Sequence, residues 1–134
     1  MRINQYKVSK EEVDALIKCP SDVRYQYSLK RIADTEVMWS VADEEESCII
    51  QTHDNQRLLP IWPFKEYAQV YGVDKTKEYK CIPIILDIFV DSFIDLIAQE
   101  KLLINVFPTE KEPLGKIVGL NTFAEDLSVL LADY

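Results

Sequence analysis

The sequence predicts an α+β fold, with an antiparallel or mixed sheet of about five strands and helices packed on it. Two patterns lead to this prediction, since apolar residues recur at helical spacing in some segments and at strand spacing in others. The length of 134 residues is typical of one domain, and a hydrophobic content of 48% supplies one sizeable core. Because neither an internal repeat nor a long linker divides the chain, we expect residues 1–134 to form a single domain.

Two helices are expected before the first strand. Ser9 and Glu12 have the spacing of a capping box, in which the Ser9 hydroxyl accepts a hydrogen bond from the amide of Glu12. Pro20 is expected to end this helix, and Ser21 or Asp22 is a suitable N-cap for the second. The core-facing positions of the second helix follow one stripe: Tyr25, Leu29 and Ile32. Its basic residues then fall on other faces: Arg24, Lys30 and Arg31.

Three strands follow, and we expect them to form an antiparallel meander: residues 37–41, 48–52 and 58–62. Four adjacent acidic residues separate the first two strands, and their mutual repulsion favours an exposed turn: Asp43, Glu44, Glu45 and Glu46. Asn55 suits the turn before the third strand, because asparagine tolerates positive φ.

Helices and strands alternate in the second half of the chain. Pro63 suits the first turn of a short helix that ends at Gly72. A strand at 81–86 contains Pro83, which favours a sheet edge because proline donates no ladder hydrogen bond. Asp87 is expected to cap the clearest helix of the chain. The apolar residues of this helix predict a wide buried face: Phe89, Val90, Phe93, Ile94, Leu96 and Ile97.

Two strands and one helix complete the expected fold. Residues 102–107 are strongly apolar and predict a buried strand, while residues 116–118 suit a short one. The last helix is expected to begin with Asn121 or Thr122 as its cap. Its apolar positions are expected to pack into the core: Phe123, Leu127, Leu130 and Leu131.

The composition argues against several classes of function. A formal net charge of −8 disfavours binding to nucleic acid or to anionic membranes, because their negative charge repels an acidic protein. Three widely spaced cysteines predict neither a disulfide framework nor a structural metal site. With only three glycines no phosphate-binding loop is expected, and we assign no cofactor and no metal. No segment is apolar enough for a signal peptide or a membrane span, so we expect a cytoplasmic location.

Three segments together resemble a known family. They are Arg24-Tyr25-Gln26-Tyr27-Ser28-Leu29-Lys30-Arg31-Ile32-Ala33-Asp34 with Trp39 following, Leu59-Pro60-Ile61-Trp62-Pro63 with Tyr67-Ala68, and Ile104-Asn105-Val106-Phe107-Pro108-Thr109. This pattern is similar to the bacterial family of unknown function DUF2750, and the resemblance covers most of the chain. It implies a small cytoplasmic α+β domain and no particular activity. The strand–strand–helix pattern that ends at residues 60–63 also resembles, more weakly, the N-terminal domain of the SseB-type secretion regulators.

The first functional hypothesis is a non-enzymatic interaction or regulatory module that binds a basic protein partner. Two acidic features suggest it, the first being the turn at residues 43–46. The second is a row of carboxylates at positions i, i+4 and i+8 of one helix: Asp87, Asp91 and Asp95. The alternative is that both features are plain solvated surface. The sequence leaves the oligomeric state open, and a homodimer is compatible with it.

The second hypothesis is a small-molecule or anion-binding domain. Arg24 and Arg31 are seven residues apart and so share one helix face in an otherwise acidic chain. Three aromatic residues are candidates to complete the site: Tyr27, Trp39 and Trp62. The alternative is that the arginines form surface ion pairs and the tryptophans belong to the core.

An enzyme ranks third, and we assign no catalytic residue. The only histidine is His53. Cys48 lies five residues before it, so the two side chains would face opposite sides of a regular strand, and Ser47 would lie about 20 Å from His53 along the strand. Neither pair is then within hydrogen-bond reach. The 23 acidic residues offer many carboxylate pairs, and for that reason none of them can be singled out.

Overall fold

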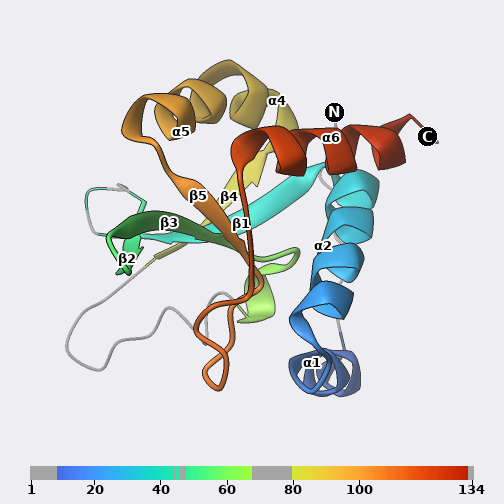
Figure 1. Cartoon of the computed structure of the whole chain (residues 1–134). Helices are drawn as coiled ribbons and strands as arrows, with labels where there is room; N and C mark the ends of the chain where they lie inside the picture. The colour runs from blue at the N-terminus through green and yellow to red at the C-terminus, as the bar shows by residue number, and fades with distance from the viewer. Residues whose placement is uncertain (1–8, 44, 46–47, 68–79, 133–134) are drawn as a thin grey trace.

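The computed structural model describes residues 9–43, 45, 48–67 and 80–132, and these residues form the predicted α+β fold (Figure 1). Its elements in chain order are α1 (Lys10–Ile17), α2 (Ser21–Thr35), β1 (Val37–Ala42), β2 (Gln51–His53), β3 (Gln56–Ile61), β4 (Lys80–Ile85), α4 (Leu86–Ile88), the π-helical turn η1 (Phe89–Phe93), α5 (Ile94–Glu100), β5 (Leu103–Val106), β6 (Lys116–Val118) and α6 (Leu120–Leu131). The predicted cap of the first helix is confirmed, because the Ser9 side chain accepts from the amide of Glu12 at 3.1 Å.

The strands form two sheets. The larger has the order β2-β3-β5-β6, in which β3 and β5 are parallel and the other pairs are antiparallel. The smaller pairs β1 with β4, and Pro83 lies on β4, which is an edge strand of this pair. Two backbone hydrogen bonds of 2.8 Å between Trp39 and Trp62 connect β1 to the residue that follows β3.

The expected three-strand meander is therefore only partly correct. β2 and β3 form the predicted hairpin, and Asn55 in its turn has a φ of 65°. β1 pairs with β4, a strand from the second half of the chain. The physical reason is burial, since five of the six residues of β1 are buried, whereas the residues of β2 are exposed or half-buried and remain at a sheet edge.

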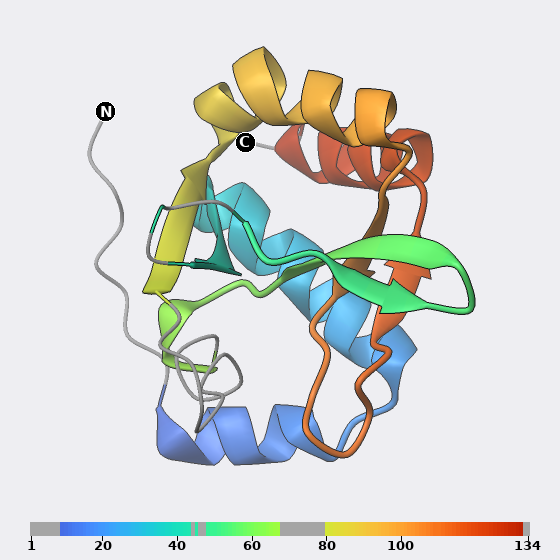
Figure 2. The same ribbon diagram turned by 90° about the vertical axis from the view of Figure 1, so that its left-hand side faces the viewer.

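Helices α2 and α6 pack against each other and against the larger sheet, and α1 lies across the start of α2 (Figure 2). The predicted core positions Tyr25, Leu29 and Ile32 are confirmed as buried. α6 also buries Phe123 and Leu127, but its N-cap is Gly119, so the expected caps Asn121 and Thr122 are wrong by two and three positions. The helices thus cover the sheet as the apolar spacing predicts.

The segments α4, η1 and α5 form one helical run at residues 86–100, at the top of Figure 1. Asp87 is not its cap, because the helix already begins at Leu86, whose amide donates to the Glu36 carbonyl at 3.0 Å. The expected wide buried face is also too wide. Phe89 and Ile97 are buried, but Val90 is 62% exposed. A π-helical turn places residues at other angles than the α-helical spacing assumes, which shifts the apolar stripe.

Two predicted features lie partly outside the described residues. Glu44 and Glu46 of the acidic turn fall outside, while Glu45 is exposed and its amide donates to Oδ1 of Asp43 at 2.9 Å. The helix expected after Pro63 is seen at residues 65–67, and its predicted end at Gly72 again falls outside.

Candidate functional site

The five residues predicted to form an anion site are found in three places. Tyr27 and Arg31 lie together on α2, where Arg31 Nη1 donates to the Tyr27 hydroxyl at 2.7 Å. Trp39, half-buried, and Trp62, fully buried, are joined through their backbones. Arg24 contacts the segment after β5. The structure therefore brings these residues together in smaller groups, and their use as one binding site stays a prediction.

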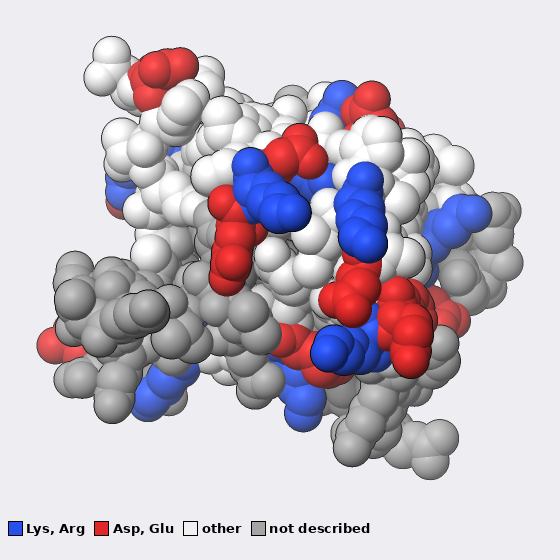
Figure 3. Space-filling model, turned by 90° about the horizontal axis from the view of Figure 1, so that it is seen from below, with Lys and Arg blue, Asp and Glu red and all other residues white. Residues whose placement is uncertain are grey.

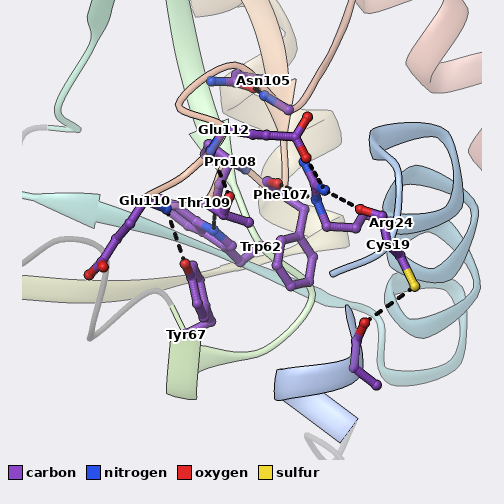
Figure 4. Close-up of polar contacts among 12 residues, drawn as sticks. Cys19, Arg24, Trp62, Tyr67, Asn105, Phe107, Pro108, Thr109, Glu110 and Glu112 are labelled. Carbon is purple, nitrogen blue, oxygen red and sulfur yellow. Dashed lines mark hydrogen bonds and ion pairs between the residues drawn. The ribbon is translucent and has the colours of Figure 1, made fainter. Parts of the chain in front are cut away.

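Arg24 is fully buried, and its guanidinium joins three segments of the chain (Figure 4). Nε donates to the carbonyl of Phe107 at 3.1 Å, and Nη1 donates to the carbonyl of Cys19 at 2.6 Å. Nη1 also forms an ion pair with Oε1 of Glu112 at 3.0 Å. The expectation that Arg24 points away from the core is wrong, because these acceptors offset the cost of burying its charge.

The segment 107–115, here called the β5–β6 loop, is held by further hydrogen bonds. Trp62 Nε1 donates to the carbonyl of Pro108 at 3.0 Å. Thr109 and Glu112 close a turn. The amide of Thr109 donates to the carbonyl of Glu112 at 2.9 Å, and the amide of Glu112 donates to the hydroxyl of Thr109 at 2.9 Å. Trp62 is therefore a core residue that positions the loop.

Asn105 fixes the far end of the same loop from inside β5. Its Nδ2 donates to Oε1 of Gln51 at 2.9 Å and to the carbonyl of Pro113 at 3.0 Å. Its Oδ1 accepts from the amide of Gly115 at 2.7 Å. Gly115 has no room for a side chain, since a Cβ would lie 2.9 Å from the backbone carbonyl of Phe107. This end of the loop therefore depends on one buried amide and one glycine.

A second polar group surrounds Arg31. The Tyr27 hydroxyl donates to Oε2 of Glu12, and Arg31 Nη1 lies 3.3 Å from the same oxygen. The guanidinium of Arg31 also lies 5.5 Å from the ring centre of Phe64. Burial, and then the hydrogen bond to Glu12, raise the pKa of Tyr27. Tyr27 therefore keeps its proton, and the charge of Arg31 is already balanced by Glu12.

These contacts bring together residues from the three segments that carry the family resemblance. Residues 24–34, 59–63 and 104–109 meet around the β5–β6 loop, as Figure 4 shows for Arg24, Trp62 and Phe107. The sequence reasoning missed Glu112 and the role of Asn105. A polar residue in the middle of the apolar strand 102–107 was the one available signal for Asn105.

The predicted acidic row lies on a different surface, the helical run 86–100. All three of its carboxylates are exposed: Asp87, Asp91 and Asp95. Three large apolar side chains on the same run are also exposed, namely Ile88 (48%), Val90 (62%) and Leu96 (41%). We call this set of six residues the helix 86–100 surface. The sequence pattern missed its apolar part, because it assigned Val90 and Leu96 to the core.

Charge is distributed differently on the face seen from below in Figure 3. There, the described basic and acidic side chains lie next to one another. Neighbouring charges of opposite sign cancel over a short distance in salt solution. The described residues of this face therefore offer a basic partner a mixed rather than an acidic surface.

Burial and neighbouring acidic groups set the state of two cysteine thiols, and the histidine lies beside an acidic residue. Burial raises the pKa of the Cys48 and Cys81 thiols, that of Cys81 to about 11, so both thiols are protonated at neutral pH. His53 lies 3.3 Å from Oδ2 of its neighbour Asp54, on an exposed turn. Within the described part of the chain, no three histidine, cysteine or acidic side chains are grouped so that they could hold a metal ion.

Residues 25–127 match the family described as "Protein of unknown function (DUF2750)". A solved structure described as "Anabaena Tic22 (protein transport)" is similar over 65% of this chain and 48% of its own length, at 13% identity and a TM-score of 0.41. The chain thus spans about half the length of that protein. No curated protein matches the chain significantly. The weaker likeness to the SseB-type N-terminal domain stays a prediction.

No helix in the described part of the chain is both long enough and apolar enough to cross a bilayer.

Proposed function

The chain belongs to the DUF2750 family, whose description names no activity, and we propose that it is a non-enzymatic interaction module for a basic protein partner. Its proposed docking site is the helix 86–100 surface. One observation carries the proposal: Ile88, Val90 and Leu96 are exposed on the same helical run as a row of carboxylates. Exposed apolar groups rimmed by charge are typical of surfaces that bind other proteins.

The apolar side chains supply the affinity in this proposal. Each of them contacts water in the free protein, so covering it with a partner releases about 25 cal/mol for every Å² of apolar area removed from water. Two further large apolar residues of the described chain are exposed, Val23 on α2 and Val129 on α6. Each of these is the one exposed large apolar residue of its own helix, so neither helix offers a comparable surface.

The carboxylates supply the selectivity for a basic partner. Asp91 and Asp95 are exposed beside the apolar residues, and the whole chain has a net charge of −8. A field of this sign attracts basic proteins and speeds their encounter, while it disfavours acidic competitors. Interaction through this surface is therefore expected to weaken as salt is added.

Asp43 and Glu45, the described residues of the acidic turn, are not part of the same surface. The turn follows Ala42, which pairs with Lys80 at the start of β4, whereas the helix follows Ile85 at the end of β4. These two ends of the strand are separated by about 17 Å. A partner that contacts both would have to be extended, so we base the proposal on the helix alone.

The test uses charge reversal on two surfaces. The variant D91K/D95K reverses the helix 86–100 surface, and the control D14K/D34K makes the same change in net charge at exposed positions on α1 and α2. Asp87 is left unchanged, because an acidic residue in the first turn stabilises the helix. Each tagged protein is incubated with lysate of the source cells, and retained proteins are identified by mass spectrometry at low and high salt.

The expected result is a basic protein that is retained by the unchanged chain and by the control but not by D91K/D95K. Its retention should fall at high salt, and V90S/L96S should weaken it without any change in charge. Equal retention by D91K/D95K and by the control would refute the proposal. Loss with the control alone would move the docking site to α1 and α2.

A further inference from the structure

We propose that Arg24 is the centre of a carboxylate-binding site, and that the chain's own Glu112 occupies this site as an internal competitor. The site does not depend on the helix 86–100 surface. In both ribbon views the β5–β6 loop lies at the opposite end of the molecule from that helix (Figures 1 and 2). The two proposals therefore succeed or fail separately.

The hydrogen bonds of Arg24 leave part of its guanidinium unused. Nε and Nη1 donate to two carbonyl oxygens and to Glu112. Nη2 is buried as well, yet it has no hydrogen-bond partner among the residues that the structure describes. A buried donor without an acceptor is destabilising, and more so when it belongs to a charged group. The guanidinium can therefore bind one more acceptor at a gain in free energy.

Glu112 is suited to exchange with another anion. Its contact with Arg24 uses one oxygen and one nitrogen, so it is a one-point ion pair and not the two-point fork that arginine forms with a well-placed carboxylate. The side chain of Glu112 is also 50% exposed, although that of Arg24 is fully buried. It can therefore turn outward into water without disturbing packed neighbours.

The expected ligand is a carboxylate, because the carboxylate of Glu112 already forms an ion pair with Arg24. A carboxylate fits against Arg24, and a free one can align both of its oxygens with Nη1 and Nη2 because no backbone restrains it. Such a ligand would keep the buried charge of Arg24 neutralised while Glu112 is displaced. The two carbonyl acceptors, of Phe107 and Cys19, would stay in place.

Two sources present this chemistry, a small carboxylic acid and the C-terminus of a peptide. Acetate serves as the probe for the first. A short N-acetylated alanine peptide serves for the second, and the same peptide with an amidated C-terminus is its control. Tighter binding of the free-acid peptide than of acetate would identify a peptide terminus as the ligand; equal binding would identify a small carboxylate.

The decisive variant is Glu112→Gln, and its matched control is Glu110→Gln. Both remove one negative charge from the same loop, but the side chain of Glu110 is exposed, and its backbone amide donates to the Tyr67 hydroxyl. Binding is followed through the Nε–H signal of Arg24 in NMR spectra of labelled full-length protein. Acetate replaces chloride at constant ionic strength during the titration.

Without its competitor, the Glu112→Gln protein is expected to bind acetate about tenfold more tightly than Glu110→Gln, since a recovered charged hydrogen bond is worth about 1.5 kcal/mol. Adding Arg24→Lys to Glu112→Gln should abolish this gain, because lysine cannot form the two-point fork. If acetate moves the Arg24 signal equally in both single variants, or in neither, the inference is wrong. The comparison of Glu112→Gln with Glu110→Gln tests the inference even if the Arg24→Lys protein does not fold.

Discussion

The two ends of the molecule use polar and apolar residues in opposite ways. At the β5–β6 loop, Arg24 and Asn105 are fully buried and hydrogen-bonded to the backbone of the loop. On the helix 86–100 surface, Val90 and Leu96 are apolar and exposed. Each end thus departs from the usual arrangement of apolar residues inside and charged residues outside.

Because of this difference, the loop and the helix 86–100 surface are expected to have different roles, the loop in stability and the surface in binding. A buried polar residue is costly to lose, because its partners remain buried without hydrogen bonds. An exposed apolar residue contributes little to the free energy of unfolding, since it contacts water in both the unfolded and the folded state. Substitutions at the loop are therefore expected to act on the free energy of unfolding, and substitutions on the helix surface on binding.

Among substitutions at the loop, the largest effect is expected for Gly115→Ala. The added Cβ would lie 2.9 Å from the backbone of Phe107 and closer still to the carbonyl oxygen of Val106, so the loop must shift. We expect a loss of about 3 kcal/mol in the free energy of unfolding, measured by urea denaturation. Gly119→Ala is the control, because a Cβ there meets nothing within 4 Å. Equal losses in both variants would contradict the close packing of this loop.

A loss of about 2 kcal/mol is expected for Asn105→Ala, because the amide of Gly115 and the carbonyl of Pro113 both lose their buried partner. Thermal unfolding followed by circular dichroism measures it. Asn121→Ala, at an exposed position on α6, is the matched control and should cost under about 0.5 kcal/mol. If Asn105→Ala behaves like this control, the amide network does not hold the loop.

A smaller, pH-dependent effect is expected on β4, which leads into the helical run. Burial, and then the charge of Glu66, raise the pKa of Cys81 from 9.0 to about 11. The folded state therefore holds this proton more tightly than the unfolded state. The resulting stability is fully present below pH 9 and is lost as the pH rises toward 11.

Urea denaturation at pH 7, 9 and 10.5 measures this loss. Cys81→Ser should flatten the decline above pH 9, and Cys19→Ser, which removes another half-buried thiol, is the matched control. Burial also raises the pKa values of Tyr25 and Tyr27, so part of the loss of stability at high pH is expected to remain in both variants. An identical decline in the two cysteine variants would show that Cys81 is not desolvated.

The smallest effect is expected for Val90→Ser, which should change the free energy of unfolding by less than about 0.5 kcal/mol. The side chain is 62% exposed, so folding buries little of it. Ile97→Ala, on the same run but 1% exposed, should cost about 2–4 kcal/mol and serves as the contrast. A large loss for Val90→Ser would show that this residue supports the fold and would remove it from the proposed docking site.

The sequence alone determined most of the secondary structure and the α+β class. Ser9, the stripe of Tyr25, Leu29 and Ile32, and the strands around 58–62 and 102–107 are all local signals, and the structure confirms them. Such features depend on residues within one or two turns of each other. Residue spacing and residue type are therefore sufficient to predict them.

The tertiary structure decided which segments meet. Arg24 is followed by 82 residues before Phe107, its acceptor, and β1 pairs with β4 across the hairpin that lies between them. Val90 is exposed in a π-helical turn whose neighbouring residue Phe89 is buried against Phe123 of α6. These outcomes follow from the packing of surfaces that are distant in the chain, and local spacing carries no information about them.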